Sequence, residues 1–320
     1  MSETTLSFVT VDVFTQTRYK AGNPLPIVYL PENAPITQER KQLIAREFAL
    51  SETVFLHTPP AAPGTWKIDI FTTYLEHPFA GHPTIGTAVY VLKKQWETSG
   101  TQLTQDSGSE NINGTFLTKA GRIEISYNPS NGIARAAIPQ KHHIHAWRCP
   151  LPFLFDKQRD LDPSHLKDPS AGLPVVSIVD GMTFILAELS SLDALSRVLL
   201  QHGNVTCTLD VGWSRPQRPF YFYVRLSDGM DGMKRFRTRL FMKDAEDPAT
   251  GSAACALAGY IARSEGKRGQ SVIVKVVQGV EMGRECEIGV EVKLGEDGGV
   301  EGVWLSGSAV DVMSGQLPLC

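Results

Sequence analysis

The chain has 320 residues, about twice the length of a common domain, so we expect two domains. Its hydrophobic fraction of 42% and charged fraction of 20% exclude a disordered chain and a membrane protein. The formal net charge of −3 argues against nucleic acid or an anionic membrane surface as the main partner.

The cysteines and the first residues predict a cytoplasmic protein. The odd number of cysteines and the lack of a CxxC pair favour reduced thiols over a disulfide framework or a zinc cage. The five are Cys149, Cys207, Cys255, Cys286 and Cys320. Residues 1–5 contain neither a basic region nor an apolar signal core. The apolar run Ala253–Ala262 is well short of the ~20 residues that span a bilayer.

The first part of the chain reads mainly as strands. Residues 6–14 alternate with a period of two, which predicts a strand. Residues 35–50 are rich in helix formers and place Ile44 and Phe48 on one face, which predicts a helix. Segment 98–114 is rich in Ser, Thr, Asn and Gly and is expected to be an exposed loop. Further strands are expected at residues 27–30, 67–72 and 121–127, and residues 54–56 form a short apolar run.

Residues 139–152 lack periodicity and predict a crossover between a domain of residues 1–138 and a domain of residues 139–320. This division allows the C-terminal tail of the second domain to pack back on the first domain. A helix is expected at residues 192–201, and strands at residues 175–179, 221–226, 272–277 and 288–292. Many short strands with few helices favour the α+β class. The chain has no GxGxxG or GxxxxGK[ST] loop, so we expect no nucleotide cofactor.

An internal repeat is the most informative feature of the sequence. Residues 82–88 align with residues 247–253 without a gap, and the two copies lie about half a chain apart. Both read Pro-x-x-Gly-[Ser/Thr]-Ala after a titratable residue, His82 or Asp247, and both lead into an apolar run typical of a buried helix. The other interpretation is two unrelated helix starts, since Pro and small residues are common there.

If the repeat is real, the protein is pseudo-symmetric and two helix N-termini point at a shared cleft. Free N–H groups and the partial positive charge at each start would bind a carboxylate or stabilise a developing oxyanion. Gly86 and Gly251 would let the backbone approach the ligand closely. The sequence therefore predicts an acidic small molecule as the ligand.

Several blocks in order along the chain resemble the PhzF-like isomerase family of phenazine biosynthesis. They are Val11–Phe14, Gly22–Pro24, Ser51–Phe55, Phe79–Thr84, Glu246–Ala253, Gln278–Gly279, Met282–Arg284 and Leu305–Val310. The resemblance implies a diaminopimelate-epimerase-like fold of two similar domains, each a barrel-like sheet around a central helix, with the active site between them. It also implies an isomerase that uses neither a cofactor nor a metal, and a homodimer.

The same resemblance implies which residues act. By motif, Glu52 is the acid/base group, while His82, Asp247 and Ser252 position the substrate and relay protons. The residues expected to contact the substrate are Gly22, Asn23, Gly81, Thr84, Thr250 and Gly251. The expected reaction moves a proton within a small acidic, cyclic metabolite, and the sequence does not name that metabolite.

Acid–base chemistry supports these roles, but each of the four residues also has a structural interpretation. Glu52 precedes the apolar run 54–56, so burial is expected to raise its pKa toward neutrality. Glu52 is otherwise a solvated or capping residue, and His82 a hydrogen-bonding residue at a helix start. Asp247 is also expected to cap the helix that follows. Ser252 is otherwise a small packing residue.

Three rival interpretations remain. A racemase of the same fold would use two thiols at the helix starts, which here carry His82 and Asp247 while Cys255 lies inside the helix. An epimerase with other acid/base groups and a non-catalytic small-molecule-binding protein are the alternatives.

For two further groups of residues, we expect neither a catalytic nor a metal-binding role. His142, His143 and His145 lack a matching carboxylate, so no metal site is expected there. The charged stretch 230–239 is expected to be solvated, with Arg239 facing an acidic substrate as the alternative.

Overall fold

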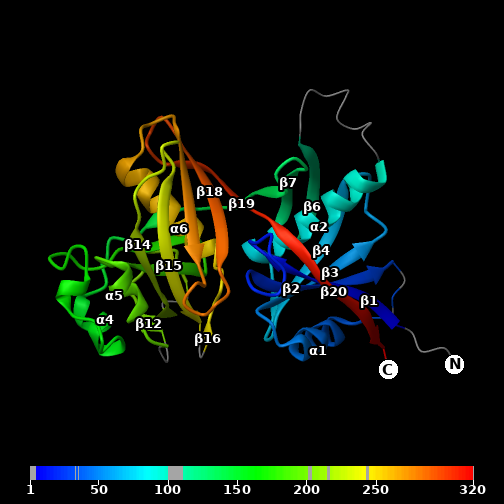
Figure 1. Cartoon of the computed structure of the whole chain (residues 1–320), viewed down its shortest axis with the longest axis horizontal. Coiled ribbons are helices and arrows are strands. Elements are labelled where there is room, and N and C mark those ends of the chain that lie inside the picture. Colours follow the sequence, from blue (N-terminus) through cyan, green and yellow to red (C-terminus); the bar gives the residue numbers. More distant parts are fainter. Residues whose placement is uncertain are drawn as a thin grey trace. The chain divides into compact units, whose positions relative to one another are not determined.

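The computed structural model describes residues 5–32, 34, 36–99, 111–200, 204–214, 217–242 and 245–319. The chain divides into two compact units (Figure 1). Unit 1 comprises residues 1–138 and 306–320, and unit 2 comprises residues 139–305. No described helix is both long and apolar enough to cross a membrane.

Unit 1 is a mixed sheet in the strand order β20–β1–β2–β3–β4–β6–β7–β8. Its strands are β1 (Thr5–Val13), β2 (Asn23–Pro31), β3 (Glu52–Thr58), β4 (Thr65–Thr72), β6 (Ile112–Thr118), β7 (Gly121–Asn128), β8 (Ile133–Ala137) and β20 (Ala309–Pro318). A short strand, β5 (Glu76–His77), pairs with β4. The helices are α1 (Gln38–Phe48) and α2 (Gly81–Ser99).

Unit 2 has the strand order β9–β10–β11–β14–β15–β17–β18. These strands are β9 (His143–Ile144), β10 (Val175–Val179), β11 (Met182–Glu188), β14 (Phe220–Arg225), β15 (Lys234–Met242), β17 (Ser271–Gln278) and β18 (Cys286–Leu294), and β19 (Val300–Gly307) follows. The remaining elements are α4 (Leu151–Lys157), the 3-10 turn η1 (Pro163–His165), α5 (Leu192–Ser196), β12 (Val205–Thr206), β13 (Gln217–Arg218), β16 (Ala245–Glu246) and α6 (Gly251–Glu265).

The two units repeat one topology. Starting from β20 in unit 1 and from β9 in unit 2, the pairings run antiparallel, antiparallel, parallel, antiparallel, parallel, antiparallel. Each unit inserts its long helix at the same point, after the hairpin β4–β5 or β15–β16 and before the next strand. This duplication confirms the fold class predicted from the sequence.

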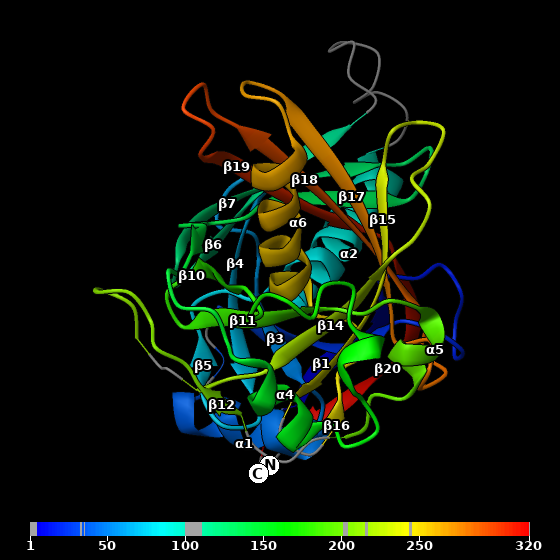
Figure 2. The same cartoon turned by 90° about the vertical axis from the view of Figure 1, so that its left-hand side faces the viewer.

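Both long helices are buried because their sequences are apolar or small on nearly every side. α2 contacts strands along the whole sheet of unit 1, from β20 to β8. α6 packs on β10, β11, β17 and β18 (Figure 2). Gly86 lets α2 approach the sheet, since a Cβ there would lie 2.6 Å from a Val13 methyl and 2.7 Å from a Leu25 methyl. The expectation that Gly86 admits a ligand was therefore wrong.

Several predicted boundaries were also wrong. The helix expected at 192–201 ends at Ser196, and residue 201 lies outside the described residues. The first helix begins at Gln38, capped by the Thr37 hydroxyl, which accepts from the Arg40 N–H. Of the loop expected at 98–114, the first residues belong to α2 and the last to β6, while residues 100–110 lie outside the description. The crossover 139–152 contains β9 and the start of α4.

Candidate active site

Glu52 and His82 form a hydrogen-bonded pair in unit 1. Glu52 is the first residue of β3 and His82 lies in the first turn of α2, next to Gly81. His82 Nδ1 lies 3.1 Å from Glu52 Oε2. The side chain of His82 is 4% exposed and that of Glu52 is 21% exposed. A carboxylate held beside an imidazole at the edge of solvent is suited to take up and release a proton.

The environment of Glu52 does not raise its pKa as the sequence predicted. Burial alone acts in that direction, but the hydrogen bond and charge of His82 outweigh it, helped by Ser51 and His77. The net effect holds the pKa of Glu52 below its ordinary value. Glu52 is therefore a carboxylate at neutral pH, and it can begin a proton transfer only as the base.

His82 has a second ring nitrogen available for chemistry. Because an ionised carboxylate only accepts, Nδ1 carries the proton in the bond to Glu52. Nε2 is buried and has no hydrogen-bond partner among the residues that the structure describes. A buried polar atom without a partner is costly in a folded protein, so it indicates a position where a ligand group bonds.

In unit 2, the two predicted site residues Asp247 and Thr250 are hydrogen-bonded to each other. The Asp247 carboxylate accepts from the Thr250 hydroxyl at 2.6 Å and from the Ala249 N–H at 3.3 Å. Asp247 is not the N-cap of α6, as we had expected. That position belongs to Thr250, whose hydroxyl donates to Asp247 and accepts no capping bond from α6.

The other predicted substrate contacts have diverse local roles, and their binding role stays a prediction. Gly22 has φ of +86°, and a Cβ there would lie 2.9 Å from the Val13 carbonyl oxygen, so the turn before Asn23 requires glycine. The Thr84 hydroxyl donates to the Ala80 carbonyl at 2.7 Å. In the first turn of α6, Gly251 is buried and Ser252 half-buried, and no described residue hydrogen-bonds the Ser252 hydroxyl.

Arg239 neither faces solvent nor offers its guanidinium to a ligand. It is 7% exposed and forms a two-pronged ion pair with Glu246, with nitrogen–oxygen distances of 2.8 and 2.9 Å. Its Nη1 also donates to three carbonyl oxygens around the end of α5. Both sequence-based interpretations of Arg239 were therefore wrong, and the residue joins β15, β16 and α5.

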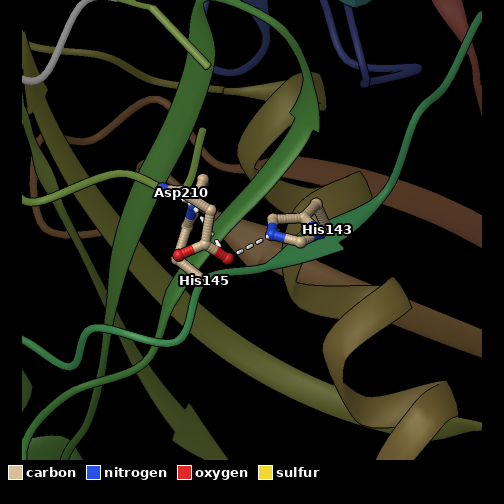
Figure 3. Close-up of side chains that lie close together, drawn as sticks. All are labelled: His143, His145 and Asp210. Carbon is tan, nitrogen blue, oxygen red and sulfur yellow. Dashed lines mark hydrogen bonds and ion pairs between the residues drawn. The ribbon is translucent and has the colours of Figure 1, made fainter. Parts of the chain in front are cut away.

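In unit 2, His143 and His145 lie close to the carboxylate of Asp210, which the sequence did not indicate. Asp210 Oδ2 lies 2.7 Å from His143 Nε2, and the candidate ligand atoms of His143, His145 and Asp210 lie within 4.8 Å of one another (Figure 3). However, the Asp210 backbone N–H donates to His145 Nδ1 at 3.1 Å, and His145 Nε2 lies 2.8 Å from the Ser177 hydroxyl. Both nitrogens of His145 are thus engaged, so a metal could bind only by breaking one of these bonds.

The cysteines within the described part of the chain do not provide racemase chemistry. Cys149, Cys207, Cys255 and Cys286 are all buried. Cys255, the one in α6, is 1% exposed, and burial raises its pKa above the ordinary thiol value. A thiolate is the reactive form, so Cys255 is a packing residue.

These features define the class of protein: a duplicated α+β chain of the diaminopimelate-epimerase-like fold with titratable side chains where its two long helices begin. The chain belongs to the phenazine biosynthesis-like protein family, PhzC-PhzF, whose model matches residues 11–315. The sequence-based prediction of an isomerase of this family is thereby confirmed.

Named relatives match over most of their length. An uncharacterized isomerase of Mesorhizobium japonicum is 29% identical over 98% of this chain and 99% of its own. The trans-2,3-dihydro-3-hydroxyanthranilate isomerase of Pseudomonas fluorescens is 29% identical over 87% of each chain. A crystal structure of a PhzF-family phenazine biosynthesis protein from Bacillus anthracis superimposes with a TM-score of 0.74 at 22% identity, over 99% of this chain and 100% of the other.

Proposed function

We propose that this protein is a cofactor-independent isomerase that moves a proton within a small, carboxylate-bearing cyclic metabolite. The observation that carries the proposal is the Glu52–His82 pair, in which an ionised carboxylate shares a proton with a buried imidazole whose other nitrogen has no partner among the described residues. The names of the isomerase relatives support the same reaction class.

In this mechanism Glu52 removes a proton from a carbon of the substrate, and the electron pair of that C–H bond moves into the conjugated system. The protonated Glu52 then returns the proton to a different carbon, so the substrate is isomerised without gain or loss of atoms. The Nδ1–H of His82 favours the charged form of Glu52 before and after the transfer. Its Nε2 is free to bond a polar group of the substrate.

The remaining predictions belong to this proposal. We infer that Asp247 and Ser252 bind and orient the acidic substrate, and that the uncapped first turn of α6 offers N–H groups to its carboxylate. The expected homodimer and the cytoplasmic location are proposals of the same kind. A non-cysteine epimerase would use the same base, but a second acid would deliver a proton to the same carbon from the opposite face.

The test is proton NMR in heavy water with trans-2,3-dihydro-3-hydroxyanthranilate, the substrate named for the Pseudomonas relative. The wild-type protein should convert the substrate into its isomer, with deuterium at the new carbon position to the extent that the carboxyl proton of Glu52 exchanges with solvent before it is returned. Glu52→Gln keeps the shape and removes the base, so turnover should fall at least about a hundredfold. Glu124→Gln removes an exposed carboxylate from β7 of the same unit and should change nothing.

The rival interpretations give different spectra. Exchange at the original carbon without isomerisation would indicate an epimerase. Binding of a substrate that is neither isomerised nor exchanged would indicate a non-catalytic binding protein. Full activity of Glu52→Gln would remove Glu52 from the mechanism. If this substrate does not bind, deuterium exchange into a panel of cyclic carboxylates identifies the class that does.

A further inference from the structure

The side chain of Gln278 holds both ends of the segment that carries Asp247. Gln278 is the last residue of β17 and is fully buried. Its Nε2 donates to the Asp247 carbonyl oxygen at 2.8 Å and lies 3.0 Å from the Thr250 hydroxyl oxygen. Its Oε1 accepts from the Thr250 N–H at 3.3 Å. One amide therefore fixes the backbone between β16 and α6.

The partners allow only one orientation of this amide. The Asp247 carbonyl can only accept and the Thr250 N–H can only donate, so Nε2 must face the first and Oε1 the second. The buried Tyr221 hydroxyl donates to Oε1 at 3.2 Å, and the Thr238 hydroxyl lies 3.3 Å from the same oxygen. Burial raises the pKa of Tyr221, so its hydroxyl keeps the proton that it donates.

The contacts continue from Gln278 to the Asp247 carboxylate. Gln278 Nε2 donates to the Thr250 oxygen, and the Thr250 hydroxyl donates to Asp247 Oδ2 at 2.6 Å. Gly279 keeps the two segments close, because a Cβ there would lie 2.8 Å from the Pro248 carbonyl oxygen. The same hydroxyl accepts no hydrogen bond from the first turn of α6.

We propose that Gln278 is a positioning residue that orients the Asp247 carboxylate through Thr250. The importance of this role for catalysis rests on the proposed function, in which Asp247 contacts the substrate. The orientation itself does not, and it can be measured without any turnover.

A second buried glutamine supplies a matched control. Gln158 in unit 2 is 1% exposed, and its amide also clamps a backbone segment. Its Nε2 donates to the Leu199 carbonyl at 2.9 Å and its Oε1 accepts from the Leu199 N–H at 2.8 Å. None of these contacts involves Asp247. Gln278→Met and Gln158→Met therefore remove comparable buried amides, and only the first breaks the chain to Asp247.

The experiment follows the carboxyl carbon of Asp247 by NMR in protein labelled with carbon-13 aspartate, with the signal assigned by its loss in Asp247→Asn. Thr250→Val removes the donor to the charged carboxylate, so the pH midpoint of this signal should rise by about one unit. Gln278→Met should raise it in the same direction, and Thr250→Ser should restore it. Gln158→Met should lower the melting temperature and leave the midpoint unchanged.

Turnover gives an independent second readout. Thr250→Val should lower kcat/KM in the wild-type background and have no further effect in Asp247→Asn, because it acts through that carboxylate. An unchanged midpoint in Thr250→Val and Gln278→Met overturns the inference. A shifted midpoint in a protein without isomerase activity supports the inference and contradicts the proposed function instead. If Gln278→Met does not fold, Gln278→Asn, which keeps the amide but shortens the side chain, replaces it in the same titration.

Discussion

Replacing His82 by leucine should destabilise the protein more at about pH 7.5 than at about pH 5. In the wild type, the pKa of Glu52 lies below its ordinary value, so this group contributes stability above that value and loses it as pH falls. Without His82, burial is opposed only by Ser51 and His77, so the balance moves toward the neutral acid. The cost of His82→Leu then falls as the pH is lowered and the stranded carboxylate takes up a proton.

The size of this effect follows from the geometry of the pair. A hydrogen bond to a charged group contributes about 1.5–3 kcal/mol, and breaking a buried ion pair costs about 3–5 kcal/mol. Glu52 is 21% exposed, so water relieves part of the cost. We expect the free energy of unfolding to fall by about 2–3 kcal/mol at the higher pH and by roughly 1 kcal/mol less at the lower pH.

Urea denaturation at both pH values measures the difference, and His57→Leu is the control. His57 Nε2 lies 2.8 Å from Asp69 Oδ2, but the Lys41 ammonium also contacts that oxygen at 2.6 Å. These partners outweigh burial and lower the pKa of Asp69 to about 2. With Lys41 still in place, Asp69 should stay charged. His57→Leu should therefore lower the free energy of unfolding at least as much at the lower pH as at the higher pH. An equal cost of His82→Leu at both pH values would refute the reasoning.

The structure makes three further predictions. Gly86→Ala should lower the free energy of unfolding by about 1–3 kcal/mol, because the new methyl would press on side chains of β1 and β2; denaturation that matches the wild type would show that α2 can shift. Arg239→Met should lower the free energy of unfolding by about 3–5 kcal/mol, because it leaves the largely buried Glu246 carboxylate without this ion pair, and adding Glu246→Gln should recover part of that loss in the same urea assay. Cys255→Ala should keep at least half of the wild-type turnover, since the thiol is buried and protonated; a loss of two orders of magnitude would restore the thiol mechanism.

The elements that the sequence predicts best depend on contacts between neighbours in the chain. Alternation over residues 6–14 indicated β1, and the repeat indicated that two equivalent long helices begin near His82 and Asp247. The short strand β9 was missed because its register is set by pairing with β10, which local periodicity cannot reveal.

The site was harder to predict because its electrostatics depend on residues far apart in sequence. The sequence predicted that burial raises the pKa of Glu52, and only the fold places His82, which lowers that pKa, beside it. Asp210 joins histidines some 65 positions earlier, and Gln278 contacts Thr250 across 28 positions. For Gln278 a signal was present, since it lies in one of the family blocks, but the motif does not reveal which atoms its amide holds.

The pairing of β1 with β20 has a consequence for how the chain folds during synthesis. β20 pairs with β1 from Thr5–Pro318 to Val13–Ala309, so unit 1 is built from both ends of the sequence (Figure 1). Unit 2 is continuous and can acquire its native contacts as soon as it leaves the ribosome, whereas unit 1 must wait for the last strand. The half that is made first is therefore completed last, and until then the edge of β1 that β20 will cover stays open to non-native strand pairing.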